Sequence, residues 1–330
     1  MKASLLKETL KLLMKARVSA FIWGPPGCGK SSIVNQISEE IKKTLYEMRA
    51  LLYEPIDVRG FPKIEDGRTI YCPPEDLPTG MNALLFIDEL NLAPLMTQNS
   101  FLQLVIPPHK LGSYELPTDC GIIAAGNRET DRVGATRMGT SLANRFVHLN
   151  MDVDNDEWLD WAIENGIAPE ICAFIKYRGD LLMTFDPKKN EKAFASPRSY
   201  EFLSNIVNEG LGELPRNAQL EIAAGTIGEG PATEFIAFTD IWRSLPVIED
   251  VLKNPSGFPI PEKPAVLFAL CGALSRKATP KTADKFFEFA NRLSGEWSVR
   301  IVNDAIKIEP KLKATKSYIN WASRNVNNMI

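Results

Sequence analysis

The chain has few residues of the types that build metal centres and disulfide frameworks. Its 330 residues include two histidines, His109 and His148, and five scattered cysteines that form no CxxC pair. This usage argues against a structural zinc site and against a small disulfide-stapled fold. It favours a reducing compartment, so we expect a cytoplasmic location.

Long apolar runs and an excess of one charge are also missing. No stretch approaches the roughly 20 apolar residues that span a bilayer, and Met1–Leu13 has the pattern of an amphipathic helix without the apolar centre of a signal peptide. The net charge is −3, so no global basic field indicates nucleic-acid binding. We expect no membrane partner. A nucleic-acid partner stays an alternative, because a local basic patch could bind it.

Strand-like segments are confined to the first half of the chain. Helical periodicity separates several of them, at Ser31–Arg49 and Met96–Val105. Alternating strands and helices predict an α/β fold with a parallel sheet covered on both faces, whose ligands bind at the carboxyl ends of the strands. The five predicted strands are Ser19–Trp23, Leu51–Ile56, Leu84–Asp88, Gly121–Gly126 and Phe146–Met151.

The second half predicts helices alone. A Pro-rich stretch at Asn254–Pro264 suggests a break between a small helical domain and a helical tail. We therefore predict three parts, residues 1–152, 153–253 and 254–330. The predicted helices are Asp156–Asn165, Pro169–Tyr177, Pro197–Asn208, Ala218–Gly225, Pro231–Leu245, Pro264–Ser275, Lys281–Leu293, Trp297–Ile308 and Leu312–Asn325.

One segment matches the phosphate-binding loop pattern in full, Gly, four residues, Gly-Lys-Ser, between a predicted strand and a predicted helix. Glycines let the backbone N–H groups surround phosphate oxygens, and the following helix directs its positive end at the anion. Lys30 is predicted to contact the β- and γ-phosphates of ATP, and Ser31 to bind Mg²⁺. The predicted nucleotide contacts are Gly24, Pro25, Pro26, Gly27, Cys28 (a small filler), Gly29, Lys30, Ser31 and Ser32.

Two adjacent acids end the apolar strand Leu84–Asp88. In a nucleotide site, Asp88 would hold the Mg²⁺ shell through water or through Ser31, and Glu89 would orient and deprotonate the attacking water. Solvated acids at a strand end are the alternative. The phosphate-binding loop upstream favours the catalytic interpretation.

Three further polar residues are candidates for the same chemistry. Asn127 follows a buried strand and could hydrogen-bond the γ-phosphate, although a turn asparagine would look alike. Arg145 precedes the last predicted strand and could stabilise the transferred phosphoryl group across a subunit boundary, with Arg132 and Arg137 as weaker candidates. Arg198, in the first turn of a predicted helix, could reach a phosphate or form a surface ion pair.

Taken together, these motifs resemble the AAA+ ATPases, and within them the MoxR-like group with its bacterial and phage members. The resemblance covers residues 1 to about 245. The segments GPPGCGKS and LLFIDE are similar to the Walker A and B motifs, which makes Glu89 the catalytic glutamate. By the same resemblance Asn127 is sensor 1, Arg145 is the arginine finger and Arg198 is sensor 2.

Two stretches resemble the hairpins of MoxR-like proteins in particular, Asp57–Pro62 with Asp66–Thr69, and Pro107–Leu116. An Asp-Gly dipeptide in the first is a strong turn signal. In the family these hairpins face the central channel of a ring, which makes Phe61 and Tyr114 candidates for client contact. Packing against their own hairpins is the alternative.

The resemblance implies a homo-oligomeric ring, a hexamer, that hydrolyses ATP with Mg²⁺ between subunits. It implies a protein client that the ring remodels or activates, with a von Willebrand factor A domain protein as partner, in a bacterium or a phage-infected host. A DNA-processing motor and a nucleotide-dependent assembly protein with little hydrolysis are the alternatives. The resemblance does not extend to the tail after Asn254, which could carry partner specificity.

Overall fold

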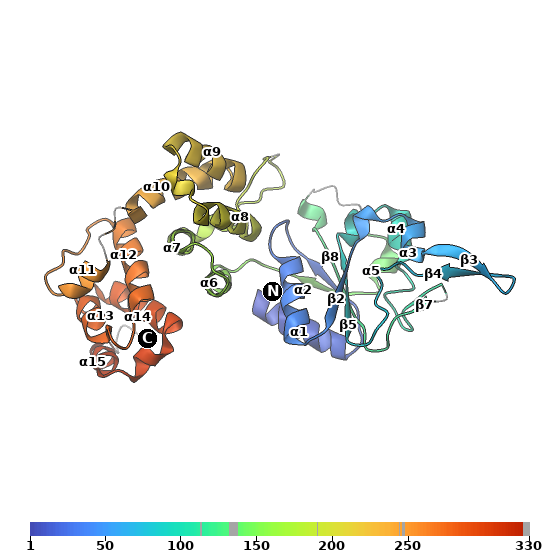
Figure 1. Cartoon of the computed structure of the whole chain (residues 1–330), viewed down its shortest axis with the longest axis horizontal. Helices are drawn as coiled ribbons and strands as arrows, with labels where there is room; N and C mark the ends of the chain where they lie inside the picture. The colour runs from blue at the N-terminus through green and yellow to red at the C-terminus, as the bar shows by residue number, and fades with distance from the viewer. Residues whose placement is uncertain (113, 132–137, 190, 244, 246–247, 326–330) are drawn as a thin grey trace. The chain divides into compact units, whose positions relative to one another are not determined.

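The computed structural model describes residues 1–112, 114–131, 138–189, 191–243, 245 and 248–325 (Figure 1). Their contacts form two compact units. The first joins Met1–Trp161 with Leu182–Leu203, and the second joins Ala162–Leu181 with the chain from Ser204 onward. The three-part division at residues 152 and 253 stays a prediction.

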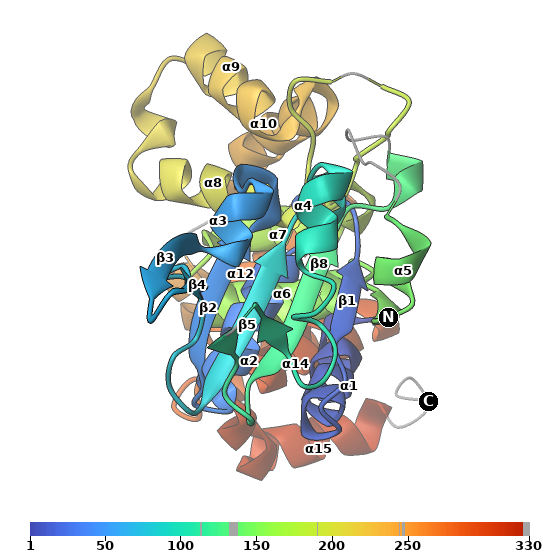
Figure 2. The same cartoon turned by 90° about the vertical axis from the view of Figure 1, so that its right-hand side faces the viewer.

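The first unit is built on a five-stranded sheet in the order β2-β5-β8-β1-β9, with every pairing parallel (Figure 2). Together with the helices on its faces and the helical region that follows, this sheet confirms the predicted α/β fold. The strands are β1 (Ala20–Trp23), β2 (Thr44–Arg49), β5 (Ala83–Asp88), β8 (Gly121–Gly126) and β9 (Val147–Asn150).

Both faces of the sheet are buried. Phe21 and its partner Ala124 belong to one apolar core, while the next pair, Ile22 and Ala125, belongs to the other. This alternation explains why the central strands read as continuous apolar runs. Helices α1 (Ala3–Lys15) and α2 (Lys30–Glu40) cover the Ile22 face, and the opposite face carries α3 (Pro55–Arg59), α4 (Leu95–Ser100) and α5 (Thr140–Ala143).

The second strand is where the sequence prediction is wrong. β2 occupies Thr44–Arg49, inside the segment predicted as helix, whereas Leu51–Ile56 forms a 3₁₀ turn and the start of α3. The helix stops at Glu40 because Lys42 has a left-handed φ of 55°. Among the strands that the structure describes, β2 pairs only with β5, at the edge of the sheet. It is half exposed, so it carries no apolar run.

Both predicted hairpins are present. β3 (Phe61–Glu65) and β4 (Arg68–Cys72) pair across Asp66 and Gly67, whose φ values of 49° and 73° fit a two-residue hairpin turn. The second hairpin joins β6 (Lys110–Leu111) to β7 (Tyr114–Glu115). Leu111 lies opposite Tyr114 in this pair.

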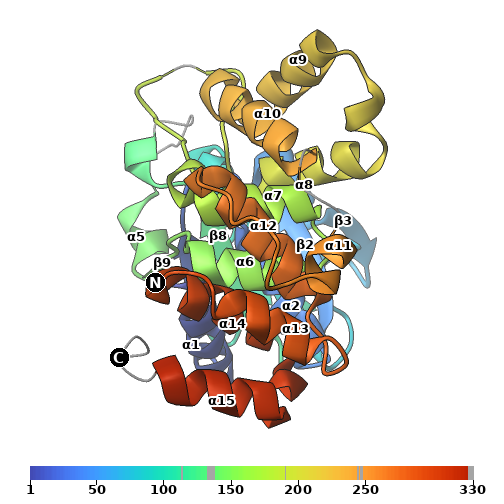
Figure 3. The ribbon, with the colours of Figure 1, turned by 90° about the vertical axis from the view of Figure 1, so that its left-hand side faces the viewer.

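After β9 the described chain continues in helices (Figure 3). The last of these share one apolar core that includes Leu274, Phe286, Phe287 and Trp321. One of them, α11, lies just before the Pro-rich stretch and was not expected from the sequence. Within the described residues, none of the helices combines the length and the apolarity needed to cross a lipid bilayer. The helices are α6 (Asn155–Glu164), α7 (Pro169–Tyr177), α8 (Pro197–Asn208), α9 (Arg216–Ile227), α10 (Glu229–Arg243), α11 (Ile248–Lys253), α12 (Pro264–Lys277), α13 (Ala283–Ala290), α14 (Gly295–Ile308) and α15 (Lys316–Asn325).

Candidate functional site

The predicted site residues converge because three neighbouring strands are parallel. β5, β8 and β1 lie side by side, so their carboxyl ends share one edge of the sheet. Asp88 ends β5, Asn127 follows β8, and Gly24 follows β1. The backbone N–H of Gly24 also donates to the carbonyl of Gly126 at 3.3 Å, which joins the loop to the end of β8.

The loop after β1 adopts a conformation that its glycines make accessible. Gly27 and Gly29 have φ values of 76° and 102°, in the left-handed region that other residues rarely adopt. Helix α2 begins directly after Gly29, at Lys30, so its first N–H groups face the loop. Ser32 is exposed on the first turn of this helix. The geometry is that of a phosphate cradle.

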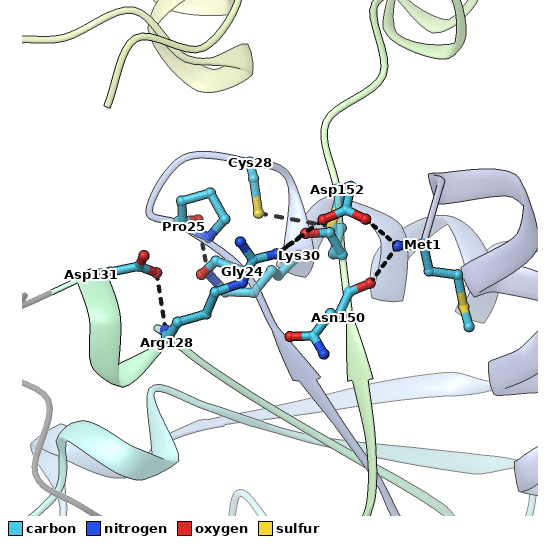
Figure 4. Close-up of polar contacts among 10 residues, drawn as sticks. Met1, Gly24, Pro25, Cys28, Lys30, Arg128, Asp131, Asn150 and Asp152 are labelled. Carbon is cyan, nitrogen blue, oxygen red and sulfur yellow. Dashed lines mark hydrogen bonds and ion pairs between the residues drawn. The ribbon is translucent and has the colours of Figure 1, made fainter. Parts of the chain in front are cut away.

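Lys30 is buried and held by three oxygen atoms. Its Nζ donates to the carbonyls of Gly24 at 2.8 Å and Pro25 at 3.1 Å (Figure 4). It also donates to Oδ1 of Asn127 at 3.0 Å. Burial lowers the pKa of the ammonium group below its ordinary value of 10.5, and the nearby charge of Arg198 acts in the same direction. A bound phosphate would add opposite charge beside this buried cation, to that of the nearby Asp88.

Ser31 and Asp88 present oxygen atoms to a common point. The Ser31 hydroxyl donates to Oδ2 of Asp88 at 2.9 Å, and the other carboxylate oxygen accepts the backbone N–H of Glu89 at 2.9 Å. Hard oxygen donors of this kind fit Mg²⁺, which proteins hold through one or two side chains together with substrate phosphates and water. Glu89 is half buried and has a left-handed φ of 55°, a strained conformation of the kind found at functional sites.

Asn127 is fixed by a residue that the sequence analysis missed. Asn91, fully buried after β5, donates from Nδ2 to the backbone carbonyl of Asn127 at 2.7 Å. A Cβ on Gly126 would lie 2.0 Å from Oδ1 of Asn91, so only glycine fits there. The available signal in the sequence was Gly126, followed by Asn127, at the end of β8. A glycine in a strand often marks a place where another group approaches the backbone closely.

Arg198 approaches the loop, while Arg145 does not contact it. The backbone N–H of Arg198 donates to the carbonyl of Gly27 at 3.2 Å, and its side chain is exposed. Arg145 follows α5, where Nη1 donates to the carbonyl of Ser141 at 2.7 Å. The weaker candidates, Arg132 and Arg137, lie outside the described residues.

Arg128 is a second residue that sequence reasoning missed. It follows Asn127 directly, and Nη2 donates to the carbonyl of Met151 at 2.8 Å and to Asp152 at 3.1 Å, while Asp131 accepts its backbone N–H (Figure 4). These bonds connect the residue after Asn127 to the chain that leaves β9. The signal in the sequence was the polar pair Asn127-Arg128, which directly follows the buried strand β8.

Cys28 is a buried filler in the loop. Its Sγ lies 3.8 Å from Sδ of Met151, and burial raises the pKa of the thiol. Because the thiolate is the reactive form, such a thiol is protected from oxidation.

No protein-family model matches the chain, and no curated protein matches it. Among solved structures it is similar to NtrX from Brucella abortus, with 17% identity over 66% of this chain and 58% of that chain at a TM-score of 0.40. The ATP complex of NtrX matches at 15% identity over 73% and 63%, with a TM-score of 0.40. A mutant of RuvB from Thermotoga maritima matches at 15% identity over 82% and 81%, with a TM-score of 0.42. The chain thus spans less than two thirds of the NtrX chains, and the assignment of the site depends on its own geometry.

Proposed function

We propose that this chain is an AAA+ ATPase that binds ATP with Mg²⁺ and hydrolyses it. The observation that carries the proposal is the convergence of Lys30, Ser31, Asp88 and Asn127 at one edge of the sheet, beside a loop whose glycines are in the left-handed conformation. Each of these side chains has a role in phosphoryl transfer that its position permits.

The mechanism follows from the contacts of these residues. The loop N–H groups and Lys30 hold the phosphates, and Lys30 exchanges its carbonyl partners for phosphate oxygens. Ser31 and Asp88 would hold Mg²⁺, which when bound supplies charge that offsets the phosphates. Glu89 accepts a proton from the attacking water, and Asn127 orients that water or the γ-phosphate.

We further propose that the site is shared between subunits of a ring, a hexamer in MoxR-like proteins. Arg145 supports this because its guanidinium lies at the end of α5 and is bonded to Ser141, not to its own phosphate-binding loop. An arginine in that position can act in trans, by stabilising the charge that develops during phosphoryl transfer in a neighbour's site. Arg198 acts in cis, because its backbone is bonded to Gly27 of the same subunit.

The client is proposed to be a protein, remodelled or activated in the cytoplasm of a bacterium or a phage-infected host, with a von Willebrand factor A domain protein as partner. The first hairpin supports client contact, since Phe61 is 65% and Ile64 84% exposed. Tyr114 does not, because it packs against the sheet core and its hydroxyl donates to the carbonyl of Pro78. We therefore assign client contact to Phe61 and Ile64.

Direct measurement of binding and turnover tests the ATPase. Wild type should hydrolyse ATP in the presence of Mg²⁺. Glu89→Gln should bind ATP with similar affinity and turn over about 100-fold or more slowly, because the general base is lost. Lys30→Ala serves as the matched control and should bind no ATP. Normal turnover by Glu89→Gln would remove Glu89 from the mechanism.

A further inference from the structure

His148 stands apart from the metal-binding and catalytic sets, yet both of its ring nitrogens are engaged. Nδ1 lies 2.8 Å from Nε1 of Trp23, and Nε2 lies 2.8 Å from the carbonyl oxygen of Ala143. An indole nitrogen only donates, so Nδ1 of His148 must accept. Nε2 then carries the proton and donates to Ala143. Trp23 thus fixes the tautomer of the ring.

The pairing of β1 with β9 brings these residues together. Phe21 lies opposite His148 in the register, and Trp23 is two residues further along the same face. The Trp23 and His148 rings are stacked, with centroids 5.8 Å apart and 24° between their planes. Phe146 completes the cluster edge-on to Phe21 at 5.5 Å. The imidazole is therefore oriented by packing as well as by hydrogen bonds.

One end of this contact adjoins the phosphate-binding loop, and the other adjoins the turn that carries Arg145. Trp23 is the last residue of β1 and is followed at once by Gly24 of the phosphate-binding loop. Ala143 ends α5, and its carbonyl oxygen also accepts the backbone N–H of Phe146 at 3.2 Å. These two bonds to one carbonyl enclose the turn that carries Arg145. The turn thus has a hydrogen-bonded connection to the start of the loop.

We propose that His148 is a positioning residue for Arg145, which it orients through the Ala143 carbonyl with its own ring held by Trp23. The inference rests on the proposed action of Arg145 in trans. His148 links the phosphate-binding loop of one subunit to the arginine that the same subunit presents to its neighbour. Loss of His148 then damages the neighbour's site and leaves its own intact.

Mixed rings test this direction of action. His148→Ala alone should keep wild-type ATP affinity and lose turnover, up to about 100-fold, because a misplaced catalytic group costs rates of that size. Mixed one to one with Glu89→Gln, it should recover activity, since about one interface in four then joins an intact Glu89 to a correctly held Arg145. Mixed with Arg145→Ala, it should recover none, because both variants carry the same defect in trans.

Each other result contradicts the inference. Loss of ATP binding in His148→Ala, or no recovery with Glu89→Gln, would place the effect in cis. His148→Gln is the conservative control, because its amide nitrogen can still donate to the Ala143 carbonyl, and it should retain most of the activity. A His148→Gln variant as inactive as His148→Ala would exclude the hydrogen bond as the cause.

One mixture separates this inference from the proposed function. Glu89→Gln with Arg145→Ala should recover activity if the arginine acts in trans. If that mixture recovers and the one with His148→Ala does not, only the role of His148 is refuted. If neither recovers, the trans mechanism fails and the positioning role fails with it.

Discussion

A Cβ added to Gly27 should disrupt the contact between the phosphate-binding loop and the residues before α8. In Gly27→Ala this atom would lie 2.6 Å from Oγ and 3.0 Å from Cβ of Ser196, and the residue would have to keep a φ of 76°. A left-handed conformation costs a residue with a Cβ roughly 1–2 kcal/mol. Overpacking of this kind adds about 1–3 kcal/mol.

Together these terms predict that Gly27→Ala loses about 2–5 kcal/mol of stability, which for a unit of this size is a fall in Tm of roughly 4–20 °C. Thermal unfolding followed by circular dichroism measures it. Gly67→Ala is the matched control, because Gly67 lies in the same unit, has a φ of 73° and has no heavy atom within 4 Å of the added Cβ. It should show the backbone cost alone.

A double-mutant cycle isolates the steric part. Ser196→Gly removes the two atoms that the new Cβ would crowd, so Gly27→Ala should cost about 1–3 kcal/mol less in that background. The reasoning is refuted if Gly27→Ala is no more damaging than Gly67→Ala. It is also refuted if Ser196→Gly leaves the cost of Gly27→Ala unchanged.

Two further predictions follow from burial and exposure. The unfolding free energy of wild type should rise relative to that of Lys30→Met as pH increases toward 10.5, because burial lowers the pKa of Lys30 in the folded protein and the unfolded chain therefore binds more protons over that range. A relative fall with increasing pH would contradict the sign. Ile64→Ser should change stability by no more than about 0.5 kcal/mol and basal turnover little, but it should reduce client capture by a Glu89→Gln trap. Tyr114→Phe should lose about 1 kcal/mol of stability with the hydrogen bond to Pro78, and it should leave client capture unchanged. Equal capture by both variants would contradict the assignment.

The sequence predicted the parts of the fold whose signals are local. The central strands are buried on both faces and therefore appear as apolar runs, as in Gly121–Gly126. The phosphate-binding loop is contiguous, so its spacing identifies it. β2 was missed because it is a half-exposed edge strand in which Met48 is the one fully buried residue. It therefore has no continuous apolar run by which it could be recognised.

The contacts that complete the site were beyond prediction because they join segments distant in sequence. Asn91 reaches Asn127 only after β5 and β8 pair, and Ser196 reaches Gly27 across most of the chain. His148 is a single histidine that belongs to no sequence motif, so the sequence did not mark it as functional. Its partners Trp23 and Ala143 are set by the β1–β9 register and by the turn before β9, neither of which the sequence specifies.

The central claim is that one catalytic site draws on two subunits. ATP turnover measured across mixtures of Glu89→Gln and Arg145→Ala, at constant total protein, tests it most directly. The account predicts negligible turnover from either variant alone and a maximum near equal proportions, where intact Glu89 and intact Arg145 meet at the most interfaces. Turnover that stays at the baseline in every verified mixed assembly would contradict it.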